Sequence, residues 1–220
     1  MTDRSNKSRM RILIICGLAA LQAAAQENSW KTEIDNSLVR VERRLVAAHE
    51  AVAAAELPPG LFVFLTDHAV RLTTASRQEE LRGKLGQFFW HPGGRIGLEN
   101  LSEHRVEVAR VTPKFSPPSE EAPAVRNSRN VVFDNDLIRV RHIRFARGGK
   151  TAMHPVVPRV LIYLSATHIT FTRAEGRVEE IRMKAGDIRF DPEGAFSDEN
   201  LGDSVEVLRI ELKAGKRDHN

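Results

Sequence analysis

The sequence has a single cysteine, Cys16, and it lies within the first 25 residues. A chain that loses this segment has no thiol, so it can form no disulfide, no cysteine nucleophile and no cysteine-ligated metal site. Aromatic residues make up only 6% of the chain, and no regular platform for stacking bases is present. These absences exclude thiol chemistry and argue against single-stranded nucleic acid as a partner.

The common catalytic motifs are also absent. The sequence has no HExxH or HxxxH spacing, no GxSxG, no Walker loop and no GxGxxG after a strand pattern. The formal net charge is +4, but the four basic residues and one acidic residue of 1–25 account for +3, which leaves +1. The basic balance is therefore weak evidence for a nucleic-acid partner, and we expect none.

The first 25 residues have the layout of a secretory signal peptide. Four basic residues precede an apolar run over 12–21, and Ala23–Ala25 offer small residues for cleavage. The run is shorter than a bilayer span requires. We therefore expect a periplasmic or secreted protein without stable membrane insertion after cleavage. The alternatives are an uncleaved anchor or a lipoprotein attached through Cys16.

The strongest positive feature is an internal repeat. The segment 35–41 (DNSLVRV) returns at 134–140 (DNDLIRV), and 99–103 (ENLSE) returns at 199–203 (ENLGD), with shifts of 99 and 100 residues. Two distant landmarks that keep nearly the same spacing indicate two copies of one fold. A copy of this size has a marginal core by itself, so we expect the copies to pack on each other.

A proline-rich segment separates the copies. We place the first copy at 29–113, the linker at 114–129 and the second copy at 130–213. Prolines among serines and glutamates are typical of an extended segment that lacks a core-facing side.

Strand patterns dominate both copies. Alternating or apolar runs of four to eight residues recur, separated by turn signals built on glycine and proline. Such runs lie at 38–41, 61–65, 137–141, 160–164, 168–172 and 205–212. This pattern predicts an all-β barrel or sandwich in each copy.

One alanine-rich stretch, 43–57, favours a helix by propensity alone. The matching stretch of the second copy contains Gly148 and Gly149, which are poor helix residues. Because two copies of one fold share their elements, we predict strands here as well.

The turn residues resemble those of the cupin superfamily, whose second motif joins a glycine, a Pro-x-Gly turn and an asparagine on a small jelly-roll barrel. The matching residues are Gly86, Pro92, Gly94 and Asn100 in the first copy and Gly186, Pro192, Gly194 and Asn200 in the second. The resemblance covers nearly all of 29–213. It implies two tandem cupin-like jelly-roll barrels, a bicupin.

The family's metal is held by two histidines and a glutamate of the first motif and a histidine of the second. The matching positions hold His154, Val156, Val160 and Ser197 in the second copy, and Ala55, Leu57, Leu61 and Gly97 in the first. A first-row metal needs three or four ligands in fixed geometry. We therefore expect degenerate metal motifs and no cofactor; the alternative is a divalent metal at His154.

His154 is the best candidate for a functional residue. Strand alternation would point it into the second barrel, where it could contact a ligand or act as a general acid or base. The alternative is a neutral remnant histidine in the barrel mouth. Ser197, Tyr163 and Arg159 complete a candidate set for a small anion or sugar-like molecule. Their alternative is a surface arginine and a packed tyrosine.

His91 and Asp191 hold the same place in the two copies, directly before the motif proline. A residue before proline is extended. We expect both to be solvated turn residues rather than a His–Asp contact between the copies.

Together these features predict an exported bicupin-like protein that is not a standard metal-dependent cupin enzyme. We expect it to bind a small polar ligand or to have a structural role. The alternatives are a cupin-type dioxygenase, isomerase or lyase that uses His154, and an interaction protein with an envelope partner. A homodimer remains open.

Overall fold

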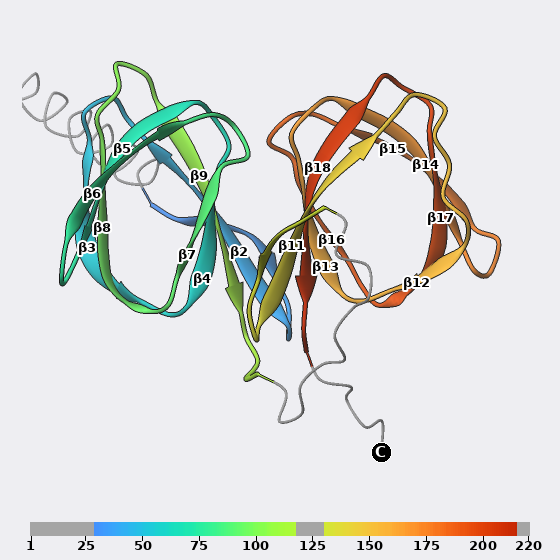
Figure 1. Cartoon of the computed structure of the whole chain (residues 1–220), viewed down its shortest axis with the longest axis horizontal. Coiled ribbons are helices and arrows are strands. Elements are labelled where there is room, and N and C mark those ends of the chain that lie inside the picture. The colour runs from blue at the N-terminus through green and yellow to red at the C-terminus, as the bar shows by residue number, and fades with distance from the viewer. Residues whose placement is uncertain (1–28, 118–129, 215–220) are drawn as a thin grey trace, which may run out of the picture.

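The computed structural model describes residues 29–117 and 130–214, which form two barrels side by side (Figure 1). The expected signal peptide and most of the expected linker lie outside these residues. The two ranges contain eighteen strands in four sheets. No helix in them is long and apolar enough to cross a membrane.

The first barrel consists of nine strands in two sheets. They are β1 (Lys31–Asp35), β2 (Val39–Val46), β3 (Ala51–Leu57), β4 (Gly60–Phe64), β5 (His68–Thr74), β6 (Gln78–Gly83), β7 (Phe88–His91), β8 (Gly94–Asn100) and β9 (Val106–Pro113). One sheet has the order β1-β2-β9-β4-β7 and the other β3-β8-β5-β6, and every pairing is antiparallel.

The second barrel repeats this arrangement strand for strand. Its strands are β10 (Val131–Asp134), β11 (Ile138–Phe145), β12 (His154–Val156), β13 (Arg159–Tyr163), β14 (Thr167–Arg173), β15 (Val178–Met183), β16 (Ile188–Asp191), β17 (Gly194–Asn200) and β18 (Val205–Leu212). Its sheet orders, β10-β11-β18-β13-β16 and β12-β17-β14-β15, are those of the first barrel. The predicted pair of jelly-roll barrels is confirmed.

The alanine-rich stretch forms strands, as the repeat predicts. β2 continues to Val46, and β3 pairs with β8 with a bulge between Val52 and Ala55. His49 turns the chain between the two strands with a φ of 57°. The ladder partner on β8 therefore overrides the helix propensity of the alanines.

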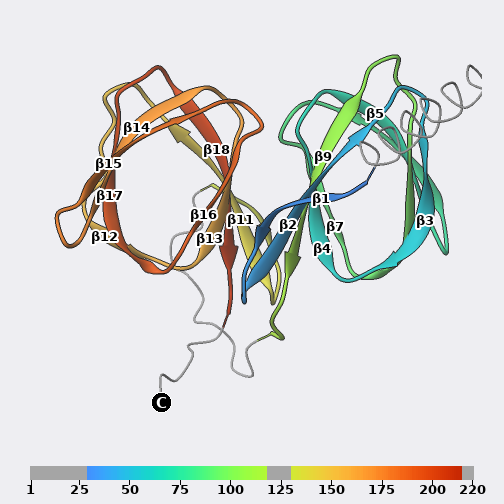
Figure 2. The same ribbon diagram turned by 180° about the vertical axis from the view of Figure 1, so that it is seen from behind.

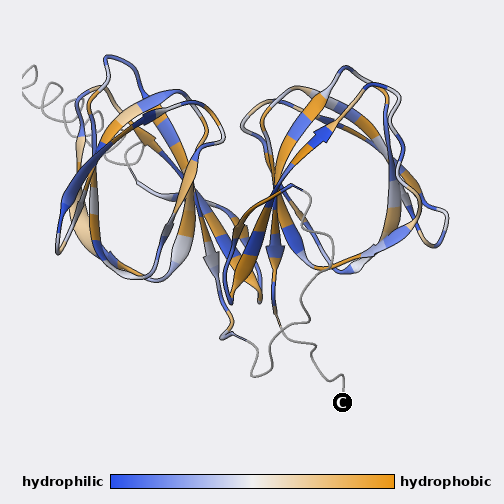
Figure 3. Ribbon diagram, viewed as in Figure 1, coloured by the Kyte–Doolittle hydropathy of each residue, from blue (hydrophilic) through white to orange (hydrophobic). Residues whose placement is uncertain are grey.

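The two barrels share an apolar core. β2 and β9 of the first barrel face β11 and β18 of the second, as the view from behind shows (Figure 2). Hydrophobic residues recur along these strands where the barrels meet (Figure 3). Each barrel contributes seven buried residues to this shared core: Val39, Val41, Leu61, Val63, Leu65, Ala109 and Val111 from the first, and Ile138, Val140, Val160, Ile162, Leu208, Ile210 and Leu212 from the second.

Strand alternation divides each barrel wall into two faces. On β4, Leu61 and Val63 point to the shared core, whereas Phe62 and Phe64 point into the first barrel. β13 repeats this division, so Tyr163 points into the second barrel. One side of these strands therefore holds the barrels together, and the other side is left to line their interiors.

Candidate functional site

The second barrel contains a partly open cavity of about 80 Å³. Apolar side chains make up most of its wall, and four polar side chains converge on it. The lining residues are Ile143, Phe145, Arg159, Leu161, Tyr163, Ile169, Phe171, Asp198, Val205, Val207 and Arg209. An apolar pocket with a few convergent polar groups is the usual form of a small-molecule site.

Three strands supply the polar groups. Arg159 and Tyr163 begin and end β13, Asp198 lies on β17 and Arg209 lies on β18. On β18, Leu208 belongs to the shared core, so the alternation of the strand turns Arg209 to the interior.

Three of the four polar side chains carry a buried atom that lacks a hydrogen-bond partner among the described residues. These atoms are the Tyr163 hydroxyl, Asp198 Oδ1 and Arg209 Nε. A buried polar group left unsatisfied costs about 1–3 kcal/mol. Because all three side chains line one cavity, a molecule held there could satisfy them together.

Arg159 is fixed by a buried ion pair. Its Nε and Nη2 each donate to Oδ2 of Asp191 at 3.2 Å, and its guanidinium lies 4.4 Å from the centre of the Phe196 ring. Asp191 also accepts from Arg189 Nε at 2.7 Å. This network holds Arg159 at the cavity wall in a defined orientation.

The expectation that His91 and Asp191 are solvated is wrong. Their exposed fractions are 5% and 2%, and each bonds within its own barrel. His91 Nε2 lies 3.1 Å from the carbonyl oxygen of Gly94, and Asp191 pairs with Arg159. His91 ends β7 and Asp191 ends β16, and each of these strands belongs to the five-stranded sheet of its barrel. This position in the sheet, rather than the following proline, decides the burial of the two side chains.

Burial shifts the ionisation of the polar groups in the cavity. It raises the pKa of the Asp198 carboxyl, against the opposing effect of the Arg159 guanidinium. Burial also raises the pKa of Tyr163 to about 12, so this residue stays a phenol and can donate at neutral pH. The pKa of Arg209 is lowered by the same cause.

Of the four predicted ligand-binding residues, Tyr163 and Arg159 line the cavity and His154 and Ser197 do not. His154 is half-buried on β12, and its Nδ1 donates to the carbonyl of Ala152 at 2.9 Å. Ser197 pairs with Thr172 of β14 and lies between two inward residues of β17. Alternation therefore turns the Ser197 side chain away from the interior.

The residues at the family's metal positions do not fit a metal centre. Val160 and Leu61 face the shared core, and Ser197 faces outward. His154 is then the single remaining nitrogen donor of the set. Among residues 29–117 and 130–214, no group of three or more His, Cys, Asp or Glu side chains could hold a metal ion.

Asp198 and Arg209 are the site residues that the sequence analysis missed. β17 has one residue fewer between Gly194 and Asn200 than the family's second motif, so counting from the glycine selected Ser197. Comparison of the copies holds the missing signal, because Asp198 stands where the first barrel has Leu98. A carboxyl at a position that is apolar in the other copy marks a specialised interior.

The first barrel keeps one of these four polar side chains, Arg110 at the position of Arg209, and lacks the other three. Phe64 replaces Tyr163 at the end of the strand, Leu98 replaces Asp198, and the position of Arg159 holds a glycine. The convergence of polar groups is therefore a property of the second barrel.

No protein-family model matches the sequence, and no curated protein matches it either. Solved structures do match the fold. AerE from Microcystis aeruginosa is 12% identical, with a TM-score of 0.61 over 84% of this chain and 97% of that one. Salicylate 1,2-dioxygenase from Pseudaminobacter salicylatoxidans is 11% identical, with a TM-score of 0.63 over 91% and 81%.

A cupin 2 conserved barrel domain protein from Leptotrichia buccalis is 10% identical, with a TM-score of 0.57 over 84% of this chain and 88% of that one. At such identities the likeness concerns the fold. With the strand order repeated in both halves of the chain, it shows that the chain has the cupin fold, as two tandem barrels.

Proposed function

We propose that the chain binds a small polar molecule in its second barrel, and that it is not a standard metal-dependent cupin enzyme. The observation that carries the proposal is the meeting of three unpartnered buried polar atoms, on Tyr163, Asp198 and Arg209, at one cavity. A purely structural barrel gains nothing from such groups, since apolar side chains of similar shape avoid their desolvation cost.

The size of the cavity limits the ligand. Its volume is about 80 Å³, and a water molecule occupies about 30 Å³ of the liquid. The space therefore suits a molecule of a few non-hydrogen atoms, or two to three waters at about 30 Å³ each.

The chemistry of the wall selects the ligand's groups. The Tyr163 hydroxyl and Arg209 Nε can donate, while Asp198 Oδ1 can accept. A matching ligand offers acceptor oxygens to the first two and a hydroxyl to the third. A small hydroxy acid such as glycolate meets these requirements.

The alternative of a cupin-type enzyme has weaker support. Structures with the same fold include a salicylate 1,2-dioxygenase, but at 11% identity this likeness concerns the fold. His154 has one ring nitrogen committed to Ala152, and its aligned partners supply no further nitrogen ligand. A binding role, in an exported protein if residues 1–25 act as a signal, accounts for more of the site.

Glycolate binding tests the proposal. We expect glycolate to shift the amide NMR signals of β13 and β18, with affinity about five- to tenfold lower in Tyr163→Phe, which loses one hydrogen bond. Asp198→Leu, which installs the residue of the first barrel, should weaken binding at least as much. Both variants should keep or slightly raise the stability of the ligand-free protein, because each removes an unpartnered buried group.

Ser197→Ala is the matched control, since Ser197 neighbours Asp198 on β17 but faces outward. Its affinity for glycolate should equal that of the parent. Equal shifts in the parent and in both cavity variants would contradict the proposal. If glycolate shifted no amide NMR signal of the second barrel, the proposal would also be contradicted. Ordered water would then be the partner of the three polar groups.

A further inference from the structure

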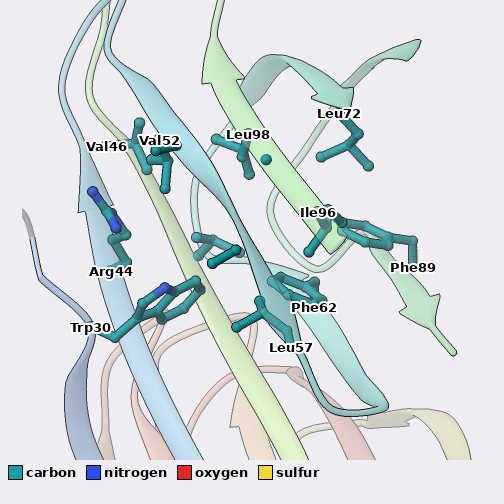
Figure 4. A pocket seen from close by; sticks show the side chains of 14 residues that line it. Trp30, Arg44, Val46, Val52, Leu57, Phe62, Leu72, Phe89, Ile96 and Leu98 are labelled. Carbon is teal, nitrogen blue, oxygen red and sulfur yellow. The ribbon is translucent and has the colours of Figure 1, made fainter. Parts of the chain in front are cut away.

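The first barrel contains a second and larger cavity, of about 150 Å³ (Figure 4). Its wall is almost wholly apolar, and Arg44 is its one charged lining residue. Arg44 Nη2 pairs with Glu50 at 3.1 Å, whereas Arg44 Nε is buried without a hydrogen-bond partner among the described residues. The chemistry of this space is therefore different from that of the polar cavity in the second barrel.

The size difference follows from individual side chains. Val46 ends β2 where Phe145 ends β11, and Leu72 stands on β5 where Phe171 stands on β14. All four residues line their own cavity. Two phenyl rings in the second barrel thus occupy space that stays open in the first barrel.

Aromatic rings form one side of the first-barrel cavity. Trp30, just before β1, meets Phe62 edge-on with ring centres 6.0 Å apart, and Phe62 stacks on Phe89 at 4.9 Å. The guanidinium of Arg110 lies over the Trp30 ring, 5.1 Å from its centre. These contacts present aromatic and aliphatic surface to the cavity.

The cavity has a route to solvent at β3. Ala53 and Ala55 line it and are solvent-exposed, and the β3–β8 ladder is interrupted between Val52 and Ala55. The second barrel places His154 at the position of Ala55, since the two residues pair with equivalent positions of β8 and β17. The small side chain of Ala55 leaves the entrance of the first barrel apolar and free of an imidazole ring.

We propose that the first barrel binds a small, mostly apolar molecule about the size of a single six-membered carbon ring. A dry apolar cavity of about 150 Å³ in another protein accepts benzene, because few polar groups are present to hold water there. The lining and volume of this cavity match that case. The site is independent of the ligand that the second barrel binds, and the two barrels would recognise molecules of opposite polarity.

Tryptophan fluorescence with toluene as the probe tests this proposal. The chain has two tryptophans, and Trp90→Phe installs the residue that the second barrel has at the same place, Phe190. Trp30 then reports from the cavity wall alone. We expect a saturable change in its emission as toluene is added. Leu72→Phe in this background should weaken binding by at least about tenfold, because the added ring occupies the cavity.

Val46→Phe fills the same cavity from another strand and serves as a second test if Leu72→Phe does not fold, with circular dichroism as the measure of folding. Phe171→Leu enlarges only the second barrel and should leave the response of Trp30 to toluene unchanged. A Trp30 emission that does not change, or changes without saturation, would overturn the proposal. Equal toluene affinity in a folded Leu72→Phe variant would do so as well.

Discussion

At the residue scale, the two barrels differ in which polar side chains their interiors accept. His68 begins β5 and is 7% exposed, and its ring stacks on Phe64 with centres 3.7 Å apart. Its Nδ1 lies 3.4 Å from the carbonyl of Thr66. The second barrel has Thr167 at this position, also buried, with its hydroxyl donating to a carbonyl two residues earlier. An imidazole and a hydroxyl thus fill equivalent positions.

His68 should make folding stability depend on pH. Burial lowers its pKa, so below about pH 6.5 the unfolded chain binds a proton that the folded chain resists. Above about pH 6.5 His68 is neutral in both states and costs no stability. As the pH falls from there toward the lowered pKa of His68, the free energy of unfolding decreases. We expect urea unfolding to show the parent losing stability between pH 7.5 and 5.5 relative to His68→Thr. Parallel pH profiles of parent and variant would refute this role.

The site residues illustrate how far single positions can be predicted. Tyr163 and Arg159 were predicted from their nearness to His154 in the sequence, and both line the cavity. Ser197 lies outside the cavity, because one missing residue in β17 reverses which side chains face inward. Register is a property of paired strands, so the motif spacing alone could not reveal it.

At the element scale, an equivalent asparagine closes each barrel where a strand meets its loop. Asn200 Nδ2 donates to the carbonyls of Phe145 and Ala146 at 3.1 Å and to that of Asp203 at 2.5 Å. Asn100 makes the corresponding bonds in the first barrel. One amide thus ties the end of β17 to the loop after β11, and this explains why both copies carry the motif asparagine.

Asn200→Ala should destabilise the protein by about 2–4 kcal/mol, because it removes the buried amide that donates to three backbone carbonyls. Thermal or urea unfolding would measure the loss. Glu199→Ala is the control, since Glu199 is the neighbouring residue and makes a surface ion pair with Lys150 at 2.9 Å. Its effect should stay within about 0.5 kcal/mol. Equal losses in the two variants would contradict the role of the amide.

The elements themselves were largely predictable because their turns carry strong local signals. Gly86 and Gly186 both adopt positive φ, 87° and 88°, in the turns that lead to β7 and β16. Side chains rarely adopt such a conformation, so these glycines mark the turns in the sequence. The direction of the Val160 side chain was harder to predict. The run 160–164 is apolar on both sides of the strand, so its sequence does not reveal which side faces the barrel interior and which faces the other barrel.

At the scale of the whole molecule, the shared core makes the barrels one folding unit. Seven buried residues from each barrel meet in it, and Arg43 of β2 donates to the carbonyl of Gly186 at 2.7 Å across the boundary. Burying an aliphatic side chain stabilises a protein by about 1.5–3 kcal/mol. Exposing one face of this core would therefore remove on the order of 10 kcal/mol, comparable with the whole stability of a domain.

We expect residues 29–117 alone to lack a cooperative unfolding transition in urea, and residues 130–214 likewise, while the intact chain unfolds in a single transition. Mixing the fragments should restore β-structure through a complex of one copy of each. Circular dichroism and sedimentation would follow both results. A fragment that unfolds cooperatively at the midpoint of the intact chain would show that the shared core is dispensable.

The covalent joining of the barrels has a consequence for how they can change over evolutionary time. In a dimer of identical subunits, every substitution appears on both sides, so a pocket altered in one is altered in the other. In this chain, Leu98 and Asp198 are encoded by separate codons, so the two positions can diverge while the residues of the shared core stay alike. Duplication within one gene thus frees each interior to follow its own chemistry, with the other half retained as its folding partner.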